Sequence, residues 1–191
     1  RLMGITVNFA PVADVDINPN NPVINVRSFG EDPRRVAKQV IAYSKGLQDG
    51  GVVAVAKHFP GHGDTDVDSH QALPVLNFTR ERLDSVELVP FREAFDAGID
   101  GVMVGHLDIP SLTERKGLAS SLSHNVVTDL LTKELGFSGL IFTDALEMKG
   151  AVNGGSASLQ ALQAGCDMLL VPSAIAPEME AILNAVAKGQ L

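Results

Sequence analysis

The fourteen residues KHFPGHGDTDVDSH, from Lys57 to His70, contain three histidines, three aspartates and one lysine. Burying so many ionisable groups is unfavourable, and the segment therefore suits a loop that performs chemistry better than a core. Asp68 and His70 stand two residues apart, where a carboxylate can hydrogen-bond to an imidazole and fix its tautomer. Because histidine titrates near neutral pH, such a pair can donate a proton in one step and remove one in the next.

A second candidate for chemistry is Asp144, which follows the apolar residues LIF in the segment GLIFTDALEMKG. A carboxylate at the mouth of a buried strand needs either a partner or a use. Held there, Asp144 can serve as a nucleophile toward an electrophilic carbon or as a general base. The alternative is that it caps the helix that follows.

Several cationic residues accompany these carboxylates. Lys57 and His58 follow a continuous apolar run and can donate to hydroxyls or to an anion, although Lys57 can equally pair with a nearby aspartate. Arg27, in NVRSFGEDP, can clamp a ligand or pair with the acidic residues that follow it. His62 stands between two glycines and is expected to shape the turn.

Metal binding is a competing use for the same loop. The spacing H-x3-H-x-D-x3-D-x-H does not match the helix-borne zinc motif H-E-x-x-H, and we therefore expect neither a metal nor another cofactor. The stretch GHGD lacks the lysine and hydroxyl residue that end a phosphate-binding loop. No serine stands in a G-x-S-x-G turn.

Composition limits the partner classes. The chain has 191 residues, of which 45% are hydrophobic and 20% charged, as in a single globular domain. A net charge of −8 without a basic run argues against nucleic acid or an anionic membrane as the main partner. No apolar run approaches the roughly 20 residues of a membrane-spanning helix. The single cysteine, Cys166, excludes an internal disulfide.

Strand-like and helix-like segments alternate along the chain. This alternation predicts a parallel α/β sheet with right-handed crossovers. The helix over 80–98 is expected to be interrupted or kinked near Pro90. Strands are expected over 5–15, 52–59, 101–110, 139–150 and 167–172, and helices over 32–51, 80–98, 124–136, 156–165 and 177–189.

Two architectures fit this alternation, an open doubly wound sheet and a (β/α)8 TIM-like barrel. Four successive strands end in ionisable residues, and barrels build active sites from the C-terminal ends of many strands. An open sheet concentrates its site at one switch point. We therefore expect a partial barrel that forms a single domain over residues 1–191. Because the chain opens with Arg1 and runs directly into a strand, we expect it to lack the first strands of the barrel.

Four motifs in order, NFAPVADVD, RSFGEDP, KHFPGHGDTDVDSH and FTDALEMKG, resemble the N-terminal barrel domain of glycoside hydrolase family 3. The resemblance is greatest to the β-N-acetylglucosaminidase (β-hexosaminidase) branch and extends from Gly4 to about Pro172. It implies an exo-acting, retaining glycosidase that works through a glycosyl-enzyme intermediate. The implied reaction removes terminal β-linked N-acetylglucosamine from short glycans or muropeptide fragments, as in peptidoglycan recycling.

The resemblance also implies roles for single residues. Asp144 takes the position of the nucleophile, and Asp68 with His70 takes that of the acid/base dyad. This dyad departs from the pair of carboxylates usual in retaining enzymes. The implied substrate-binding residues are Arg27, Lys57, His58, His106 and Met148.

Two departures from the family pattern matter. The D-x-E-G-G segment, which carries another sugar-binding aspartate in the family, is absent. A barrel lacking a strand exposes two edges, and we therefore expect residues 1–191 alone to fold poorly or bind weakly. The β-glucosidase members lack the Asp-x-His pair and take their acid/base from a second domain. The Asp-x-His pair in this chain therefore argues against a place among the β-glucosidase members.

Other functions remain open at this stage. They are a β-glucosidase, a glycoside phosphorylase, a metal-dependent barrel hydrolase and a non-catalytic sugar-binding module. The absence of tryptophan and the single tyrosine leave few flat platforms for long glycans, which favours a small carbohydrate substrate held by polar groups. The sequence does not distinguish a cytoplasmic from an exported enzyme and leaves the oligomeric state undetermined.

Overall fold

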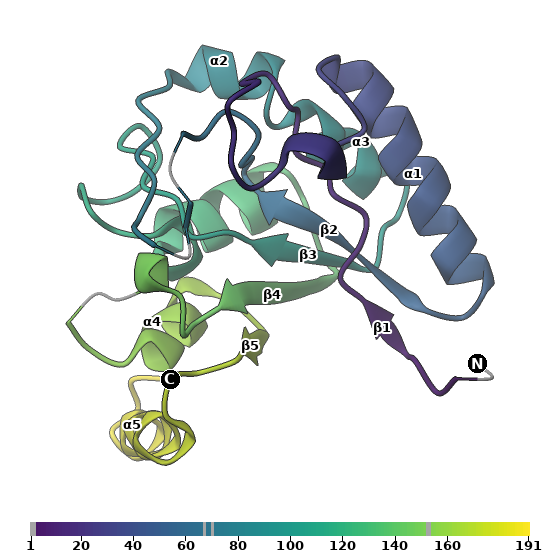
Figure 1. Ribbon diagram of the computed structural model, residues 1–191. Coiled ribbons are helices and arrows are strands. Elements are labelled where there is room, and N and C mark those ends of the chain that lie inside the picture. Colours follow the sequence, from purple (N-terminus) through teal and green to yellow (C-terminus); the bar gives the residue numbers. More distant parts are fainter. Residues whose placement is uncertain (1–2, 67, 70, 152–153) are drawn as a thin grey trace.

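The computed structural model describes residues 3–66, 68–69, 71–151 and 154–191. Within these residues, five strands form one sheet in chain order, and each strand runs parallel to the next (Figure 1). This order repeats one strand–crossover–strand unit and confirms the predicted parallel α/β alternation. The strands are β1 (Val7–Asn8), β2 (Val53–Phe59), β3 (Gly101–Val104), β4 (Leu140–Ala145) and β5 (Met168–Leu170).

The first long helix, α1 (Pro33–Asp49), begins as the sequence predicts. The side chain of Asp32 accepts a hydrogen bond of 2.7 Å from the backbone N–H of Arg35, which satisfies one of the free donors of the first turn. Proline suits that turn because its missing N–H would have no helical partner there. The other helices are η1 (Asn25–Arg27), α2 (Arg80–Ser85), α3 (Val89–Asp96), η2 (Ser120–Leu122), η3 (Asn125–Glu134), η4 (Lys149–Ala151), α4 (Ala157–Ala164) and α5 (Ile175–Ala187).

The interruption predicted near Pro90 is present, whereas the strands predicted over 5–15, 101–110 and 139–150 are shorter in the structure. The helix expected over 80–98 is divided into α2 and α3, and Pro90 lies in the first turn of α3. The strand expected over 101–110 ends at Val104, and Asp108 forms only an isolated bridge with Val75. The chain after Val104 therefore turns across the end of the sheet instead of extending it.

The sheet is curled rather than flat. The rings of Phe9, just after β1, and Phe142, in β4, meet edge to face with centroids 5.4 Å apart. Strands β2 and β3 lie between them in the sheet, and three flat strand spacings would separate the rings by roughly 14 Å. Curling toward one side confirms a partial barrel instead of an open doubly wound sheet.

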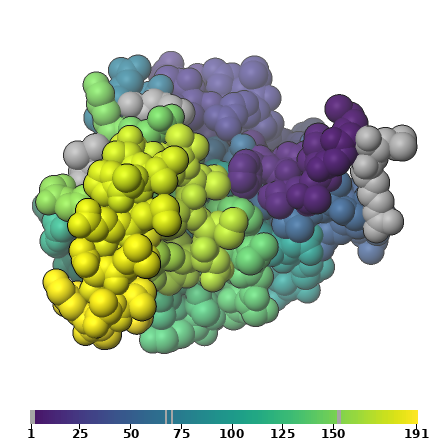
Figure 2. Space-filling view, turned by 90° about the horizontal axis from the view of Figure 1, so that it is seen from below, coloured from purple at the N-terminus to yellow at the C-terminus, as the bar shows by residue number. Residues whose placement is uncertain are grey.

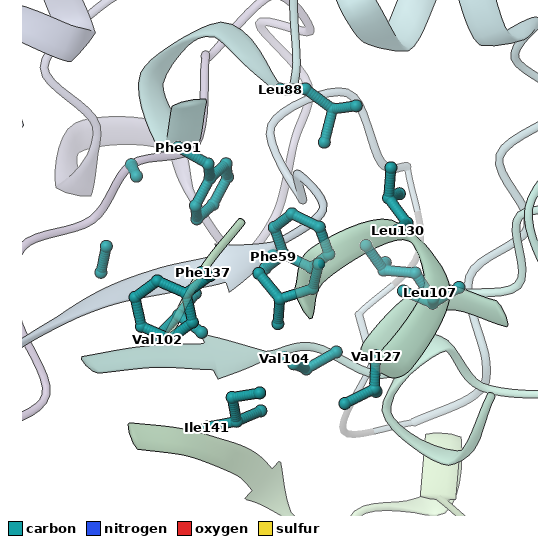
Figure 3. Packing of buried hydrophobic residues seen from close by; sticks show 14 of the residues in the cluster. Phe59, Leu88, Phe91, Val102, Val104, Leu107, Val127, Leu130, Phe137 and Ile141 are labelled. Carbon is teal, nitrogen blue, oxygen red and sulfur yellow. The ribbon is translucent and has the colours of Figure 1, made fainter. Parts of the chain in front are cut away.

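The two faces of the sheet bury different sets of side chains. The inner, concave face carries a small cluster of Val55, Met103 and Phe142 from three adjacent strands. The outer face packs against helices, and Figure 3 shows Phe59 of β2 beside Phe91 of α3 in that larger core. Their ring centroids lie 5.3 Å apart, edge to face. Burial on both faces explains the continuous apolar runs in these strands.

The C-terminal end of the molecule exposes apolar surface. Helix α5 packs against α4, and Figure 2 shows it, in yellow, on the outside of the molecule. Among the described residues, no helix combines the length and hydrophobicity needed to cross a membrane. The exposed apolar side chains of β5, α5 and the segment between them, called here the C-terminal apolar surface, are Met168, Val171, Ile175, Met179, Leu183 and Val186.

Candidate active site

Strand periodicity places two of the predicted residues on one face. Asp144 follows Phe142 by two positions in β4, and Lys57 follows Val55 by two positions in β2. Alternate residues of a strand point to the same side, and the inner rows of β2 and β4 therefore end in a cation and an anion. Both side chains line a pocket at the C-terminal edge of the sheet.

This pocket has a volume of about 290 Å³. Phe9 and Met103 contribute to its apolar lining. Two larger hollows, of about 370 and 570 Å³, lie between helices and contain none of the residues predicted to do chemistry. The polar lining consists of Arg27, Lys57, His58, His62, Ser69 and Asp144.

Asp14 anchors the polar side of the pocket. Its fully buried carboxylate accepts hydrogen bonds from His58 Nδ1 at 2.7 Å and from the backbone N–H of His62 at 2.7 Å. It also accepts from the backbone N–H of His58 at 3.1 Å. A carboxylate with this many donors fixes both the ring orientation of His58 and the start of the loop that follows β2. Sequence analysis missed this role, and the only available signal was the position of Asp14 at a predicted strand end.

His62 connects two other residues of the loop that follows β2. It is buried, with Thr65 Oγ1 2.8 Å from Nδ1 and Ser69 Oγ 3.1 Å from Nε2. Asn21 Nδ2 donates to the carbonyl of His62 at 2.9 Å. Burial lowers the pKa of His62, and the nearby His58 acts in the same direction. His62, which was expected to shape the turn, therefore also connects the side chains of Thr65 and Ser69, and it lines the pocket.

Asp144 is held in its ionised form. Burial acts to raise its pKa, but His58, His106, the backbone N–H of Ala145 and His62 together outweigh burial, and the pKa lies below its ordinary value. The backbone N–H of Ala145 also donates to Asp144 Oδ1 at 2.8 Å. An ionised carboxylate on the pocket wall is the state that nucleophilic attack requires.

Lys57 and Arg27 bring positive charge to the same pocket. Burial lowers the pKa of Lys57, and Arg27 acts in the same direction, whereas Asp144 opposes the shift. Arg27 is exposed and donates through Nη1 to the carbonyl of Val23 at 3.1 Å. The peptide bond between Lys57 and His58 is cis. These cations can donate hydrogen bonds to the hydroxyls or to a negative group of a ligand.

The remaining predicted residues lie around the pocket rather than in its lining. His106 is fully buried, and its Nε2 donates to the carbonyl of Ala145 at 3.0 Å, which places it behind Asp144. Met148 is buried in the turn after β4. Asp68 is partly buried, and His70 lies outside the described residues. The dyad, the nucleophile and all of the expected sugar contacts therefore stay predictions.

Val171 also lines the pocket, directly after β5, and sequence analysis did not single it out. Its φ of 43° lies in the left-handed region, which a β-branched residue seldom adopts. Such strain gathers at functional sites. In the part of the chain that the structure describes, no group of three or more His, Cys, Asp or Glu side chains could hold a metal ion.

Comparison with known proteins places this geometry in a family. Residues 1–191 match the family model described as the glycosyl hydrolase family 3 N terminal domain. Beta-hexosaminidase A of Pseudoalteromonas piscicida is 43% identical over 186 residues, which cover 91% of this chain and 31% of that protein. A glycoside hydrolase family 3 beta-N-acetylglucosaminidase from Paenibacillus sp. str. FPU-7 is 46% identical, with a TM-score of 0.95, over 99% of this chain and 37% of that one.

A beta-glucoside phosphorylase, BglX, is more distant. Its structure is 29% identical with a TM-score of 0.91, covering 98% of this chain and 36% of that one. This chain thus spans about a third of the length of each of these three proteins. Because the family match covers residues 1–191 and the sheet has the curl of a partial barrel, this chain belongs to glycosyl hydrolase family 3, within its N-terminal domain.

Proposed function

We propose that the protein is an exo-acting retaining glycosidase that removes terminal β-linked N-acetylglucosamine from short glycans, muropeptide fragments among them. The observation that carries the proposal is Asp144, an ionised carboxylate on the wall of a pocket that also holds two cations. The names of the relatives, beta-hexosaminidase and beta-N-acetylglucosaminidase, support the sugar.

In the first step, Asp144 attacks the anomeric carbon of the terminal sugar. His70, polarised by Asp68, gives its proton to the glycosidic oxygen as the bond from that oxygen to the anomeric carbon breaks. The products are the free aglycone and a sugar esterified to Asp144. The low pKa of Asp144 leaves its carboxylate ready to attack at neutral pH.

In the second step, His70 removes a proton from water, and the resulting hydroxide attacks the anomeric carbon. The ester to Asp144 breaks, and the carboxylate is released. Two inversions at one carbon give net retention of configuration. One histidine can serve in both steps because imidazole is a competent acid and base near neutral pH.

The pocket supports recognition of a single terminal sugar. At about 290 Å³ it lies at the small end of the range of about 300–1,000 Å³ usual for ligand sites. Arg27, Lys57 and His58 offer donors to sugar hydroxyls, and Phe9 is the only Phe, Tyr or Trp among the described lining residues. Short glycans should therefore be cleaved faster than long chitin. Faster release from long chitin would contradict an exo-acting enzyme with a small pocket.

The test of the proposal uses the full-length protein that carries this chain and 4-nitrophenyl N-acetyl-β-glucosaminide. We expect the wild type to release nitrophenol and Asp144→Asn to lose roughly 10³-fold or more in kcat, since the amide cannot form the intermediate. The matched control is Asp49→Asn, an exposed change at the far end of α1 that should leave kcat unaltered.

The possible outcomes separate the parts of the proposal. Equal activity in wild type and Asp144→Asn would remove Asp144 from the chemistry. A wild type that is inactive on this substrate but active on a β-glucoside would reject the N-acetylglucosamine specificity while keeping the reaction class. Product with inverted anomeric configuration, measured by NMR during early turnover, would reject the two-step mechanism.

A phosphorylase is the second candidate, favoured by the likeness to BglX and by Arg27 and Lys57, which can receive an anion. In that reaction phosphate replaces water as the acceptor of the glycosyl group. A phosphorylase should release N-acetylglucosamine 1-phosphate at a rate that rises with phosphate concentration. Release of free sugar at a rate independent of phosphate would reject the phosphorylase and support the hydrolase.

A further inference from the structure

The loop that follows β2 is held from its outer side by one arginine of α2. Arg82 Nη2 donates to Asp64 Oδ2 at 3.1 Å and to Glu87 Oε1 at 2.8 Å. The guanidinium carbon also lies 4.7 Å from the ring centre of Phe78, which braces the arginine by a cation–π contact. Arg82 thus joins residues from the loop, the segment before α2 and the junction between α2 and α3.

Glu87 determines where this arginine lies. The Glu87 side chain is only 2% exposed, and a buried carboxylate is strongly unfavourable unless a cation compensates it. Arg82 supplies that cation, and its guanidinium is therefore confined to one place. Asp64, at 24% exposure, is the partner through which this fixed guanidinium contacts the loop.

The backbone of the loop also rests directly on Glu87. Gly61 has a φ of 137°, and a Cβ built on it would lie 2.7 Å from Glu87 Cβ. Only glycine allows this approach, for reasons of both space and backbone conformation. The loop is therefore held at two points: Gly61 packs against Glu87 in the α2–α3 junction, and Asp64 accepts a hydrogen bond from Arg82 of α2.

From Asp64 a continuous series of contacts leads toward the predicted dyad. The residue after Asp64 is Thr65, whose hydroxyl lies 2.8 Å from His62 Nδ1. On the other side of the ring, His62 Nε2 lies 3.1 Å from Ser69 Oγ. Ser69 is the residue between Asp68 and His70 in the chain. Two hydrogen bonds therefore connect the residue after Asp64 to Ser69, the chain neighbour of both dyad residues.

We propose that Arg82, fixed by Glu87, is a positioning residue that aligns the loop through Asp64 so that the acid/base group can protonate the leaving oxygen. This inference rests on the glycosidase function proposed above and adds residues that contact neither the sugar nor the reacting atoms. Loss of the contact should impair proton donation more than it impairs binding or nucleophilic attack.

The first test removes the loop side of the contact while leaving the Arg82–Glu87 pair in place. Asp64→Ala is compared with Asp66→Ala, an exposed carboxylate of the same loop. kcat/KM, which reports the first chemical step, is measured for phenyl and 2,4-dinitrophenyl N-acetyl-β-glucosaminides. A phenolate leaves poorly without a proton, whereas dinitrophenolate leaves without help. We expect Asp64→Ala to lose about tenfold or more on the phenyl substrate and less than twofold on the dinitrophenyl substrate.

The second test removes the arginine without leaving a buried charge unpaired. The double variant Arg82→Met with Glu87→Gln is compared with Arg92→Met plus Asp84→Asn, which removes the ion pairs that Asp84 of α2 makes with Arg80 and with Arg92 of α3. We expect the first double variant to reproduce the loss on the phenyl substrate with a Tm near that of the wild type. The control pair should leave the ratio of the two substrates unchanged.

Equal losses on both substrates would overturn the proposal, because they would show general damage to the pocket. No loss on either would overturn it as well. A measurement that needs no substrate tests this inference independently of the proposed function. Amide hydrogen exchange over residues 61–66 should be faster in Asp64→Ala than in the wild type, with α1 unaltered in both. Unchanged exchange in the loop would reject the positioning role even in a protein that proves inactive on these sugars.

Discussion

At the scale of single residues, the carboxylate of Asp14 has the most direct structural influence on the pocket. It receives two backbone donors and one imidazole donor from residues 44 and 48 positions later in the chain. Its burial is tolerated because these donors replace water completely. The sugar-binding role expected of His58 therefore depends on a residue that itself lies beneath the pocket.

Asp14→Asn should destabilise the protein and lower its activity. The amide keeps one acceptor oxygen but turns an N–H group toward a donor, which leaves buried groups without partners. We expect a loss of about 1–3 kcal/mol in the free energy of unfolding, measured with denaturant. Asp49→Asn serves as the exposed control. An Asp14→Asn protein of unaltered stability and KM would show that the hydrogen bonds to the Asp14 carboxylate are dispensable.

His62 should make stability depend on pH. Its folded pKa lies below the ordinary value of about 6.5, whereas the unfolded chain binds a proton near that value. Below pH 6.5 the unfolded state therefore holds more protons, and stability is lost as pH falls.

We expect His62→Gln to lose less stability than the wild type between pH 7 and pH 5, measured by urea unfolding at both values. His124→Gln, an exposed change in the segment before η3, should retain the wild-type dependence on pH. Parallel pH profiles in wild type and His62→Gln would show that His62 is not the source of the loss.

At the scale of elements, the loop after β2 is positioned by close backbone packing as well as by hydrogen bonds. A Cβ built on Gly63 would overlap the carbonyl oxygen of Val15, in the segment that follows β1. Backbone atoms cannot swing aside as a flexible side chain can. The absence of a side chain at this position is therefore a condition for packing the loop against the segment that follows β1.

Gly63→Ala should displace the loop, with a fall in kcat/KM of about tenfold or more from misplacement of the catalytic groups. Gly46→Ala is the matched control, because this exposed position inside α1 has open space for a methyl group. That control should gain up to about 1 kcal/mol of stability from helix propensity. Full activity in Gly63→Ala would mean that the loop adapts without loss.

At the scale of the whole molecule, the curled sheet has edges at β1 and β5, and the C-terminal apolar surface lies next to β5. Contiguous exposed apolar surface drives association in water. Val171 belongs both to this surface and to the lining of the pocket, and the expectation that residues 1–191 alone fold poorly or bind weakly stays a prediction.

A polypeptide of these 191 residues should self-associate in a concentration-dependent manner. Charged substitutions at Ile175 and Leu183, both to lysine, should reduce association, measured by sedimentation velocity. Asn184→Lys adds one positive charge at an exposed polar position of α5 and should reduce association less than Leu183→Lys alone. A monomer at all concentrations, with or without the substitutions, would contradict this prediction.

Local sequence determined much of this protein by itself. The alternation of helical and strand periodicity predicted the parallel sheet, and Asp32 with Pro33 marked the start of α1. The apolar run before Asp144 predicted a carboxylate at the mouth of a buried strand, which made it a candidate nucleophile. These features depend on neighbours within a few positions, because φ/ψ preferences and side-chain periodicity are properties of short segments.

Tertiary structure alone decided which distant residues meet. The contact of Asp14 with His58 joins positions 44 apart, and that of Asp64 with Arg82 joins positions 18 apart. No local pattern encodes such pairs, since they follow from the curl of the sheet and the packing of α2 and α3 against it. The chain itself determined the chemistry available at each strand end, and three-dimensional packing determined which groups hold that chemistry in place.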